Sequence, residues 1–198
     1  MRKTSQLSDA YFLRPDGSNL AAFLYMLRNS YRSAYDLICE SVRQVAPFFR
    51  DFMLEPGPHN TETIRLAWVH QSSDKYFSAA ALSDGSFRFI ALAVLFLQPQ
   101  QFRPSVILVD EPELGLHPYA IALLASLVKQ ASAYTQVILS TQSGLLLDHF
   151  EPEDVLVAES VRGATELTRL ESAKLEAWLS DYSLGQLWEK NEIGGRPA

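Results

Sequence analysis

The residues best suited to chemistry are two adjacent acids, Asp110 and Glu111, which follow the apolar run Val106–Val109. Such a run predicts a buried strand, and open parallel sheets bind ligands beyond the carboxyl ends of their strands. Asp110 could hold Mg²⁺ directly or through water, because this ion takes oxygen ligands and keeps several waters. Glu111 could orient or deprotonate an attacking water. The alternative is a strand that ends in two solvated acids.

A second candidate is the segment Leu82–Ser86, which precedes a long apolar stretch of helical character. Ser83 or Asp84 can cap this helix, and Gly85 permits an unusual backbone dihedral. A helix N-terminus with free N–H groups and a small hydroxyl, here Ser83 or Ser86, also attracts anions. The segment therefore fits either a local cap or a phosphate contact.

Together these motifs resemble those of ABC-type ATPases in the SMC-like branch, and most closely a group of bacterial predicted AAA-family ATPases. The string Asp110–Pro118, Asp-Glu-Pro-Glu-Leu-Gly-Leu-His-Pro, looks like a Walker B motif followed by a D-loop. The resemblance implies that the D-loop, Leu114–His117, crosses a dimer interface. It also implies that Ser83, Asp84, Gly85 and Ser86 form a signature loop that contacts the γ-phosphate of ATP held by the opposite subunit. Asp84 stands where that loop usually has its first glycine.

The same resemblance marks Gln142, which follows the apolar strand Gln136–Leu139. The family usually has a histidine at this switch position, where it senses the γ-phosphate. A glutamine donates hydrogen bonds but does not titrate, so the replacement concerns the rate of hydrolysis and not the fold. Arg88, one turn into the helix after Leu82–Ser86, is open to two interpretations. It contacts the γ-phosphate or an interface, or it is a solvated or paired arginine.

The chain lacks a P-loop, since it contains no Gly-Lys pair, and without one little cradles the α- and β-phosphates. The resemblance covers residues 16–197 as the second half of the family's chain, whose first half carries that loop. We therefore expect the chain alone to have negligible ATPase activity. We expect a P-loop-bearing N-terminal half or partner chain to complete a site that uses ATP and Mg²⁺, and we expect a homodimer. A fragment, a split gene and a degenerate remnant all remain open.

The elements expected along the chain predict an α/β fold of the P-loop NTPase type, with a parallel sheet flanked by helices on both sides. Residues 1–81 should form a helical subdomain with an antiparallel hairpin. Residues 82–160 should hold the signature, Walker B and switch core, and residues 161–198 a C-terminal tail. We expect these parts to form a single domain.

The composition narrows the classes of function. A net charge of −6 gives no support to direct nucleic-acid binding, although a local basic patch remains open. The single cysteine, Cys39, is expected to be buried and fits a reducing cytoplasm, and the longest apolar run, Phe89–Leu97, is too short to span a membrane. Two other functions compete with the ATPase: a non-catalytic regulatory module, and a metal-dependent nuclease that uses Asp110, Glu111 and Glu113.

Overall fold

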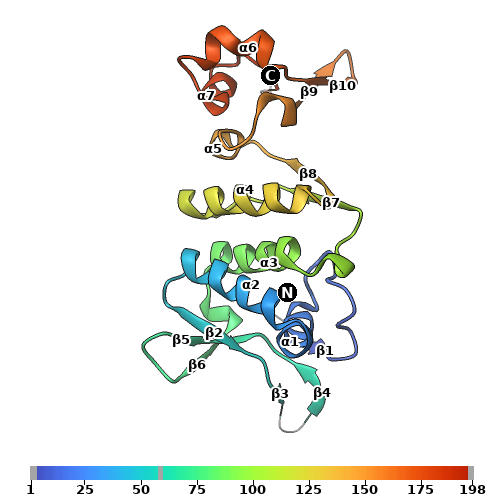
Figure 1. Cartoon of the computed structure of the whole chain (residues 1–198), viewed down its shortest axis with the longest axis vertical. Coiled ribbons are helices and arrows are strands. Elements are labelled where there is room, and N and C mark those ends of the chain that lie inside the picture. Colours follow the sequence, from blue (N-terminus) through green and yellow to red (C-terminus); the bar gives the residue numbers. More distant parts are fainter. Residues whose placement is uncertain (1–3, 58–59, 196–198) are drawn as a thin grey trace. The chain divides into compact units, whose positions relative to one another are not determined.

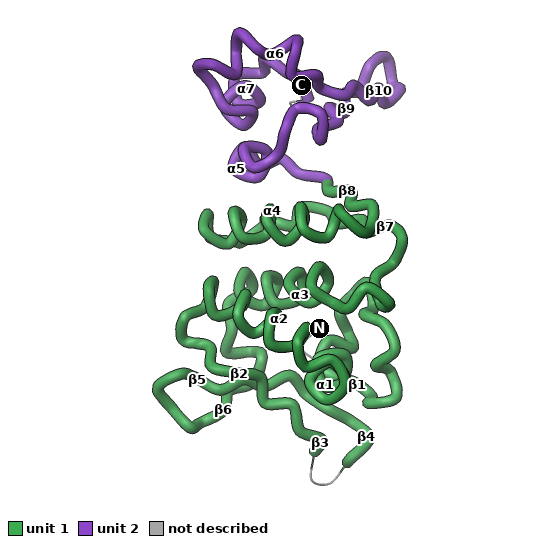
Figure 2. The backbone as a smooth tube through the Cα atoms, in the orientation of Figure 1, with its two compact units in different colours: residues 1–139 green, residues 140–198 purple. Residues whose placement is uncertain are grey.

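The structure is a computed structural model that describes residues 4–57 and 60–195. The chain forms two compact units, unit 1 (residues 1–139) and unit 2 (residues 140–198), shown in Figure 2. The chain contains both helices and strands, and the two alternate from α3 to β9 (Figure 1), which confirms the predicted α/β class.

Unit 1 contains most of the regular structure. Its helices are α1 (Leu20–Ser30), α2 (Arg32–Val45), α3 (Asp84–Leu97) and α4 (Pro118–Ser132), with short 3-10 turns at Ala79–Ala81 and Gln100–Phe102. Its strands are β1 (Ser5–Gln6), β2 (Phe49–Met53), β3 (Pro56–Gly57), β4 (Asn60–Ile64), β5 (Ala67–His70), β6 (Tyr76–Ser78), β7 (Val106–Asp110) and β8 (Gln136–Ser140), whose last residue belongs to unit 2.

The helices of unit 1 pack as neighbours in the order α1, α2, α3 and α4 (Figure 1). Helix α2 buries Tyr35, Ile38, Cys39 and Val42, the spacing of one helical face, so the expectation for Cys39 is confirmed. Leu37, which the sequence groups with that face, is 50% exposed because it points about 100° away from Ile38.

Helix α3 is buried on most sides, with neighbours α2 and α4. Its buried residues are Phe87, Phe89, Ile90, Leu92, Ala93, Val94, Phe96 and Leu97. A helix that is apolar nearly all round is stabilised by burial rather than by an amphipathic face. Among the described helices, none is both long and apolar enough to cross a membrane.

Two small antiparallel sheets lie beside these helices, with strand orders β2-β5-β6 and β1-β4-β3. The predicted hairpin is confirmed as β5–β6. The alternation of apolar residues over 63–70 predicts one strand, and this prediction is wrong. The segment is split into β4 and β5, which belong to different sheets. Ile64, Leu66 and Trp68 are all buried. Because this alternation continues through the break, the sequence pattern carries no sign of the change in pairing partner.

Strands β7 and β8 are neighbours in a separate two-stranded sheet. The amide of Gln136, at the start of β8, donates to the carbonyl of Ser105, which directly precedes β7, at 3.1 Å. Since the two strands begin side by side, they run parallel, and the connection between them contains α4. This arrangement confirms the parallel strand pair expected around the two acids.

The sequence predicts helices on both faces of this sheet, whereas the structure leaves one face exposed. Ile107 is buried, but Val106 is 45% exposed, Leu108 73% and Ile138 45%. Exposure alternates along β7 and β8, so one face of the pair is buried and the other is open.

Unit 2 contains α5 (Gly144–Leu147), β9 (Leu156–Val161), β10 (Ala164–Arg169), α6 (Ser172–Leu179) and α7 (Leu184–Glu189), with a 3-10 turn at Pro152–Asp154. Strands β9 and β10 form an antiparallel hairpin. Helices α5 and α7 approach so closely that a Cβ on Gly185 would lie 2.4 Å from the carbonyl oxygen of Gly144. The Gly185 amide also donates to Oδ1 of Asp148 at 2.7 Å. The sequence pattern predicts strands near residues 155–158 and 167–170 and helices near residues 173–180 and 184–190, and β9, β10, α6 and α7 confirm them.

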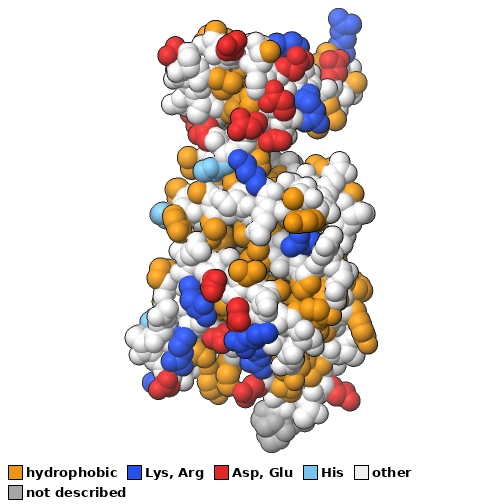
Figure 3. Space-filling view, viewed as in Figure 1, with side chains coloured by type: hydrophobic (Ala, Val, Ile, Leu, Met, Phe, Trp, Pro, Cys, Tyr) orange, Lys and Arg blue, Asp and Glu red, His pale blue; other side chains and the backbone are white. Residues whose placement is uncertain are grey.

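The net charge of the chain belongs to unit 2. Residues 140–198 include 11 of the 23 acidic residues and 5 of the 17 basic ones, whereas residues 1–139 contain 12 of each. Figure 3 shows acidic side chains gathered over unit 2 on the face in view. The net negative charge of unit 2 therefore weighs against nucleic-acid binding by that unit. Unit 1 has no net charge.

A polar cluster joins helix α2 to strand β2. Oδ1 of Asp51 accepts hydrogen bonds from the Tyr35 hydroxyl at 2.6 Å and from the Phe52 amide at 2.8 Å, and the Cys39 sulfur lies 3.5 Å away. Tyr35 and Cys39 are buried, and their burial raises the pKa of both groups, that of the Cys39 thiol to about 12. Both groups are therefore neutral when the protein is folded near pH 7.

This cluster predicts a loss of stability in alkali. When a pKa is raised by folding, the unfolded chain releases its proton first, so the stabilisation is complete below about pH 9 and declines toward pH 12. We expect the double variant Tyr35→Phe, Cys39→Ala to lose about 1–3 kcal/mol at pH 7. We expect a shallower decline above pH 9 than in the parent. Urea unfolding at pH 7 and above pH 9 measures the free energy of unfolding, with the exposed Tyr134→Phe as control. An equal decline of this free energy with pH in the parent and the double variant would contradict the prediction.

Candidate functional site

The segment Leu82–Ser86 forms the N-terminus of α3, as predicted. Ser83 is the N-cap, and its Oγ accepts from the Ser86 amide at 3.1 Å and donates to the Ser86 hydroxyl at 2.9 Å. Asp84 is the first helical residue, where a carboxylate is favoured by the helix dipole. Both Ser83 and Asp84 are exposed, so this helix end is accessible to a ligand or a partner.

Gly85 brings the signature segment against the loop that follows the two acids. A Cβ on Gly85 would lie 2.1 Å from the carbonyl oxygen of Gly115 and 3.1 Å from its carbonyl carbon. No other residue fits without moving the backbone, so glycine is required here by close approach. Gly115 itself has a φ of +77°, in the left-handed region. The sequence marks both glycines through the motifs but gives no sign that they meet.

Arg88 connects α3 to the second acid. Its Nη1 donates to the backbone carbonyl of Glu111 at 3.0 Å, and the same oxygen accepts from the Leu114 amide at 3.2 Å. Glu111 has a φ of 43°, a left-handed conformation that costs a non-glycine residue roughly 1–2 kcal/mol. The structure thus shows Arg88 as a paired arginine, which is one of the two interpretations of this residue. Arg88 holds the strained strand exit at Glu111.

The two acids differ in their surroundings. Asp110 is the last residue of β7 and is exposed, whereas Glu111 is half-buried in the turn that follows. In the part of the chain that the structure describes, no three His, Cys, Asp or Glu side chains are grouped to hold a metal. Asp110, Glu111 and Glu113 therefore do not form the metal cluster that the nuclease interpretation requires. A single carboxylate is compatible with Mg²⁺, which also takes water and phosphate oxygens as ligands.

His117 has a structural role at the end of the segment Leu114–His117. Its Nδ1 accepts from the Tyr119 amide at 3.3 Å, and His117 is the N-cap of α4, with Pro118 in the first turn. An accepting Nδ1 leaves the ring proton on Nε2 in the neutral form. The preceding turn is held by a hydrogen bond from the Leu116 amide to the Glu113 carbonyl at 2.9 Å. Contact of His117 with a nucleotide or a second subunit stays a prediction.

Gln142 lies in unit 2, on the segment between β8 and α5, and is exposed. The hydroxyl of Thr141 accepts from the Ser143 amide at 3.0 Å, and the Ser143 hydroxyl caps α5 by accepting from the Leu146 amide at 3.3 Å. The backbone on the C-terminal side of Gln142 is thus well fixed within unit 2. Its role as a switch residue is not tested by this geometry.

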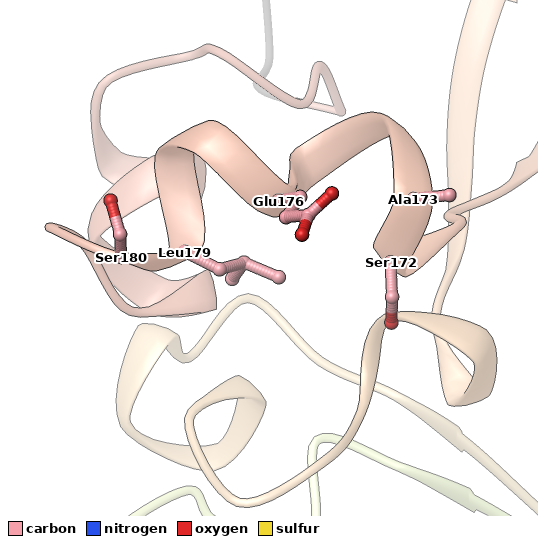
Figure 4. A pocket seen from close by; sticks show the side chains of 5 residues that line it. All are labelled: Ser172, Ala173, Glu176, Leu179 and Ser180. Carbon is pink, nitrogen blue, oxygen red and sulfur yellow. The ribbon is translucent and has the colours of Figure 1, made fainter.

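Two depressions on the described part of the chain are lined by residues other than the candidates. One depression in unit 2 is lined by Ser172, Ala173, Glu176, Leu179 and Ser180, all from α6 or its end (Figure 4). Another, in unit 1, is lined by residues 7–11 and 25–30. At the candidate site itself, Asp110 at the end of β7 and Ser83 and Asp84 at the start of α3 are exposed.

The fold is similar to that of SMC ATPase heads. An SMC ATPase solved for ATP-driven dimerisation and DNA-stimulated activation has a TM-score of 0.57 at 19% identity, with 80% of this chain and 96% of that chain covered. The Smc head of Pyrococcus furiosus, bound to the C-terminal domain of ScpA, has a TM-score of 0.58 at 18% identity. That comparison covers 80% of this chain and 39% of the other.

The SMC head domain of Thermotoga maritima has a TM-score of 0.50 at 18% identity, with 76% and 52% of the two chains covered. Thus the chain spans nearly all of one solved SMC chain but only about half or less of the two longer heads. These similarities define the class of fold: it is like that of SMC ATPase heads.

Residues 8–148, more than half of the chain, match the family described as "AAA domain, putative AbiEii toxin, Type IV TA system". The chain belongs to this AAA-domain family. Among curated proteins, none matches the sequence. The resemblance drawn from the motifs is confirmed for family and fold, and the assignment to a C-terminal half stays a prediction.

The contact between Gly85 and Gly115 generates a stability prediction. Gly85→Ala forces the start of α3 away from a backbone carbonyl, and such overpacking costs about 1–3 kcal/mol. Gly57→Ala is the control, since among the described residues its Cβ would meet the Asn60 carbonyl at 3.5 Å, an ordinary contact, and it should change stability by less than about 1 kcal/mol. Urea unfolding of both variants measures the difference. Equal stability of the two would contradict the close contact.

Proposed function

We propose that this chain is an ATP-binding and ATP-hydrolysing module that contributes a signature loop, Walker B acids and a D-loop to a dimeric SMC-like ATPase. The observation that carries the proposal is the close approach of Gly85 to Gly115. It joins the two segments whose residue types fit phosphate contact and hydrolysis, in a chain of an AAA-domain family.

In this proposal the two acids act in different ways. Asp110, exposed at the end of β7, holds Mg²⁺ directly or through water. When bound, Mg²⁺ neutralises negative charge on the nucleotide phosphates. Glu111 orients or deprotonates the attacking water, and the hydrogen bond from Arg88 to its carbonyl fixes the backbone that carries this side chain.

The N-terminus of α3 supplies the anion contact. Ser83, Asp84, Gly85 and Ser86 would face the γ-phosphate of ATP held by a second subunit, and the exposure of Ser83 and Asp84 supports this. The segment Leu114–His117 would cross between the subunits. Gln142 would replace the titrating histidine of the switch position and would serve as a hydrogen-bond donor only.

The phosphate cradle must come from elsewhere, because the sequence has no Gly-Lys pair. We propose a P-loop-bearing N-terminal half or partner chain, with the completed assembly working as a homodimer in the cytoplasm. The coverage of only 52% of the SMC head domain of Thermotoga maritima supports a missing part. DNA, which stimulates one SMC ATPase of this fold, receives no support here from the charge of either unit.

A second candidate function is a non-catalytic regulatory module that keeps the fold and the dimer surface. Two observations favour it: the absence of a P-loop from the sequence, and a glutamine at position 142. The retained pair Asp110 and Glu111 favours the ATPase, because a purely structural strand end does not require two acids beside a strained turn.

Turnover measurements distinguish these functions. We expect the purified chain alone to show no Mg²⁺-dependent ATP hydrolysis above background. With its P-loop-bearing partner we expect turnover, and Glu111→Gln should lower kcat at least about 100-fold because it removes the general base. Glu166→Gln, on exposed strand β10, is the control and should leave kcat unchanged.

Robust turnover by the chain alone, abolished by Glu111→Gln, would contradict the need for a partner. Turnover of the completed assembly that survives Glu111→Gln would contradict the role of Glu111. A completed assembly that binds ATP without any turnover would favour the regulatory module.

A further inference from the structure

Helix α6 (Ser172–Leu179) in unit 2 has no buried residue. Its larger apolar side chains are half-buried, as in Leu175 and Leu179, or exposed, as in Trp178, which is 43% exposed. A helix shorter than about 12–15 residues is marginally stable by itself in water, so it depends on the packing of an apolar face. Within the described part of the chain, α6 gains little of that packing, and its surface is available to a partner.

Polar contacts hold the start of α6. The Ser172 amide donates to Oε1 of Glu153 and the Ser172 hydroxyl donates to Oε2, both at 2.8 Å. These two hydrogen bonds lower the pKa of the Glu153 carboxyl, so it stays charged near pH 7. Directly before the helix, Glu171 pairs with Lys174 at 2.6 Å. The helix is therefore anchored at its first turn and exposed along the rest of its length.

One side of α6 forms a depression of about 530 Å³ (Figure 4). We call it the α6 depression, and it is lined by Ser172, Ala173, Glu176, Leu179 and Ser180. Pockets for small molecules have similar volumes, but they enclose about 70–90% of the ligand surface. Because all five lining residues belong to α6 or follow it directly, this depression has a wall on one side only. The other walls must come from the molecule that fills it, which fits a second polypeptide better than a small ligand.

The polar side chains of the α6 depression are hydrogen-bond acceptors. The Ser172 hydroxyl donates to Glu153, and the Ser180 hydroxyl donates to the Ala177 carbonyl at 3.0 Å, so both oxygens offer a partner only their lone pairs. A carboxylate such as that of Glu176 also only accepts. Among the described residues, the Glu176 side chain has no hydrogen bond or ion pair. The group that matches these acceptors is an ammonium or a guanidinium, which donates several hydrogen bonds and accepts none.

The charge of unit 2 favours the same kind of partner. Its 11 acidic and 5 basic residues give it the net charge of −6. Opposite charges across an interface speed the encounter and suppress wrong partners. A second copy of this chain would bring the same acidic surface against Glu176, and a nucleic acid or an anionic membrane would bring phosphates, so all three are repelled. The charge therefore selects a basic polypeptide segment.

We propose that the α6 depression is the docking surface for a basic segment of another protein, in which an aliphatic side chain is flanked by Lys or Arg. The aliphatic side chain packs on Ala173 and Leu179, and a flanking cation pairs with Glu176. Binding covers the exposed side of α6 and thereby stabilises this short helix. The proposal is independent of the proposed function, whose two acids lie in unit 1.

Site-specific crosslinking in the cells that make the protein tests the occupant. A photoreactive phenylalanine analogue replaces Ala173 in the full chain, and the crosslinked peptides are sequenced by mass spectrometry. The matched control has the analogue at Leu167, which is 64% exposed on β10 of the same unit. We expect position 173, and not position 167, to crosslink to a segment of another protein with an aliphatic residue flanked by Lys or Arg. An acidic or uncharged segment, a second copy of this chain, or no crosslink specific to position 173 would overturn the proposal.

A synthetic peptide with the crosslinked sequence measures the contact by fluorescence anisotropy with the purified full chain. We expect Glu176→Gln to weaken binding about 5-fold, which is the strength of an exposed ion pair. Ala173→Lys should weaken binding at least about 10-fold, because it places a cation against the basic segment. The control Glu166→Gln removes the same charge from the exposed strand β10 and should change the affinity less than about 2-fold.

The salt dependence of binding tests the charge pairing separately from the fold. Higher salt should weaken binding to the parent more than binding to Glu176→Gln, because salt screens exposed charges. Since Ala173 and Glu176 are exposed, thermal melting of both variants should match that of the parent, which shows that they fold. Unchanged affinity of Glu176→Gln and Ala173→Lys, or equal salt dependence of Glu176→Gln and the parent, would overturn the proposal.

Discussion

The arrangement of unit 1 depends on a place where two stretches of backbone meet with no side chain between them. At Gly85 and Gly115, the start of α3 lies against the loop that leaves β7, and a single Cβ would come within 2.1 Å of a carbonyl oxygen. The hydrogen bond from Arg88 to the Glu111 carbonyl fixes the same loop one step earlier. Because α3 is buried among its neighbours, the position of the loop is set by the core, and the strained φ of Glu111 is maintained by packing rather than by local preference.

The residues proposed for the chemistry are distributed unevenly between the two units. Unit 1 is neutral overall and contains the acids, the exposed end of α3 and the open face of β7 and β8, whereas unit 2 contains Gln142 and the whole net negative charge. Phosphates would be repelled by added negative charge, so an anionic nucleotide is better suited to a neutral unit whose helix N-terminus is exposed. What unit 1 lacks is a cradle for the α- and β-phosphates, and the sheet that ought to be covered is left open beside Asp110.

The sequence predicts most of the elements and both motifs because these rest on local signals. The cap at Ser83 and the strand before Asp110 follow from neighbouring residue types and are confirmed. The contact between Gly85 and Gly115 joins positions thirty residues apart, and nothing in either motif alone reveals it. The split between β4 and β5 was hidden for a different reason, since burial alternates without interruption while the pairing partner changes. The sequence does not predict the exposed face of β7, because a continuous apolar strand indicates burial on both faces. It does not show which face other parts of this chain cover.

The central claim is that α3 holds the loop of the second acid in place. Amide hydrogen exchange of residues 113–117 tests it most directly, in the parent, in Arg88→Ala and in Gly85→Ala. If the claim is correct, both substitutions raise exchange in that loop at least about tenfold, while exchange in the β9–β10 hairpin of unit 2 stays at the parental rate. Unchanged exchange in the loop, or an equal rise throughout both units, would contradict it.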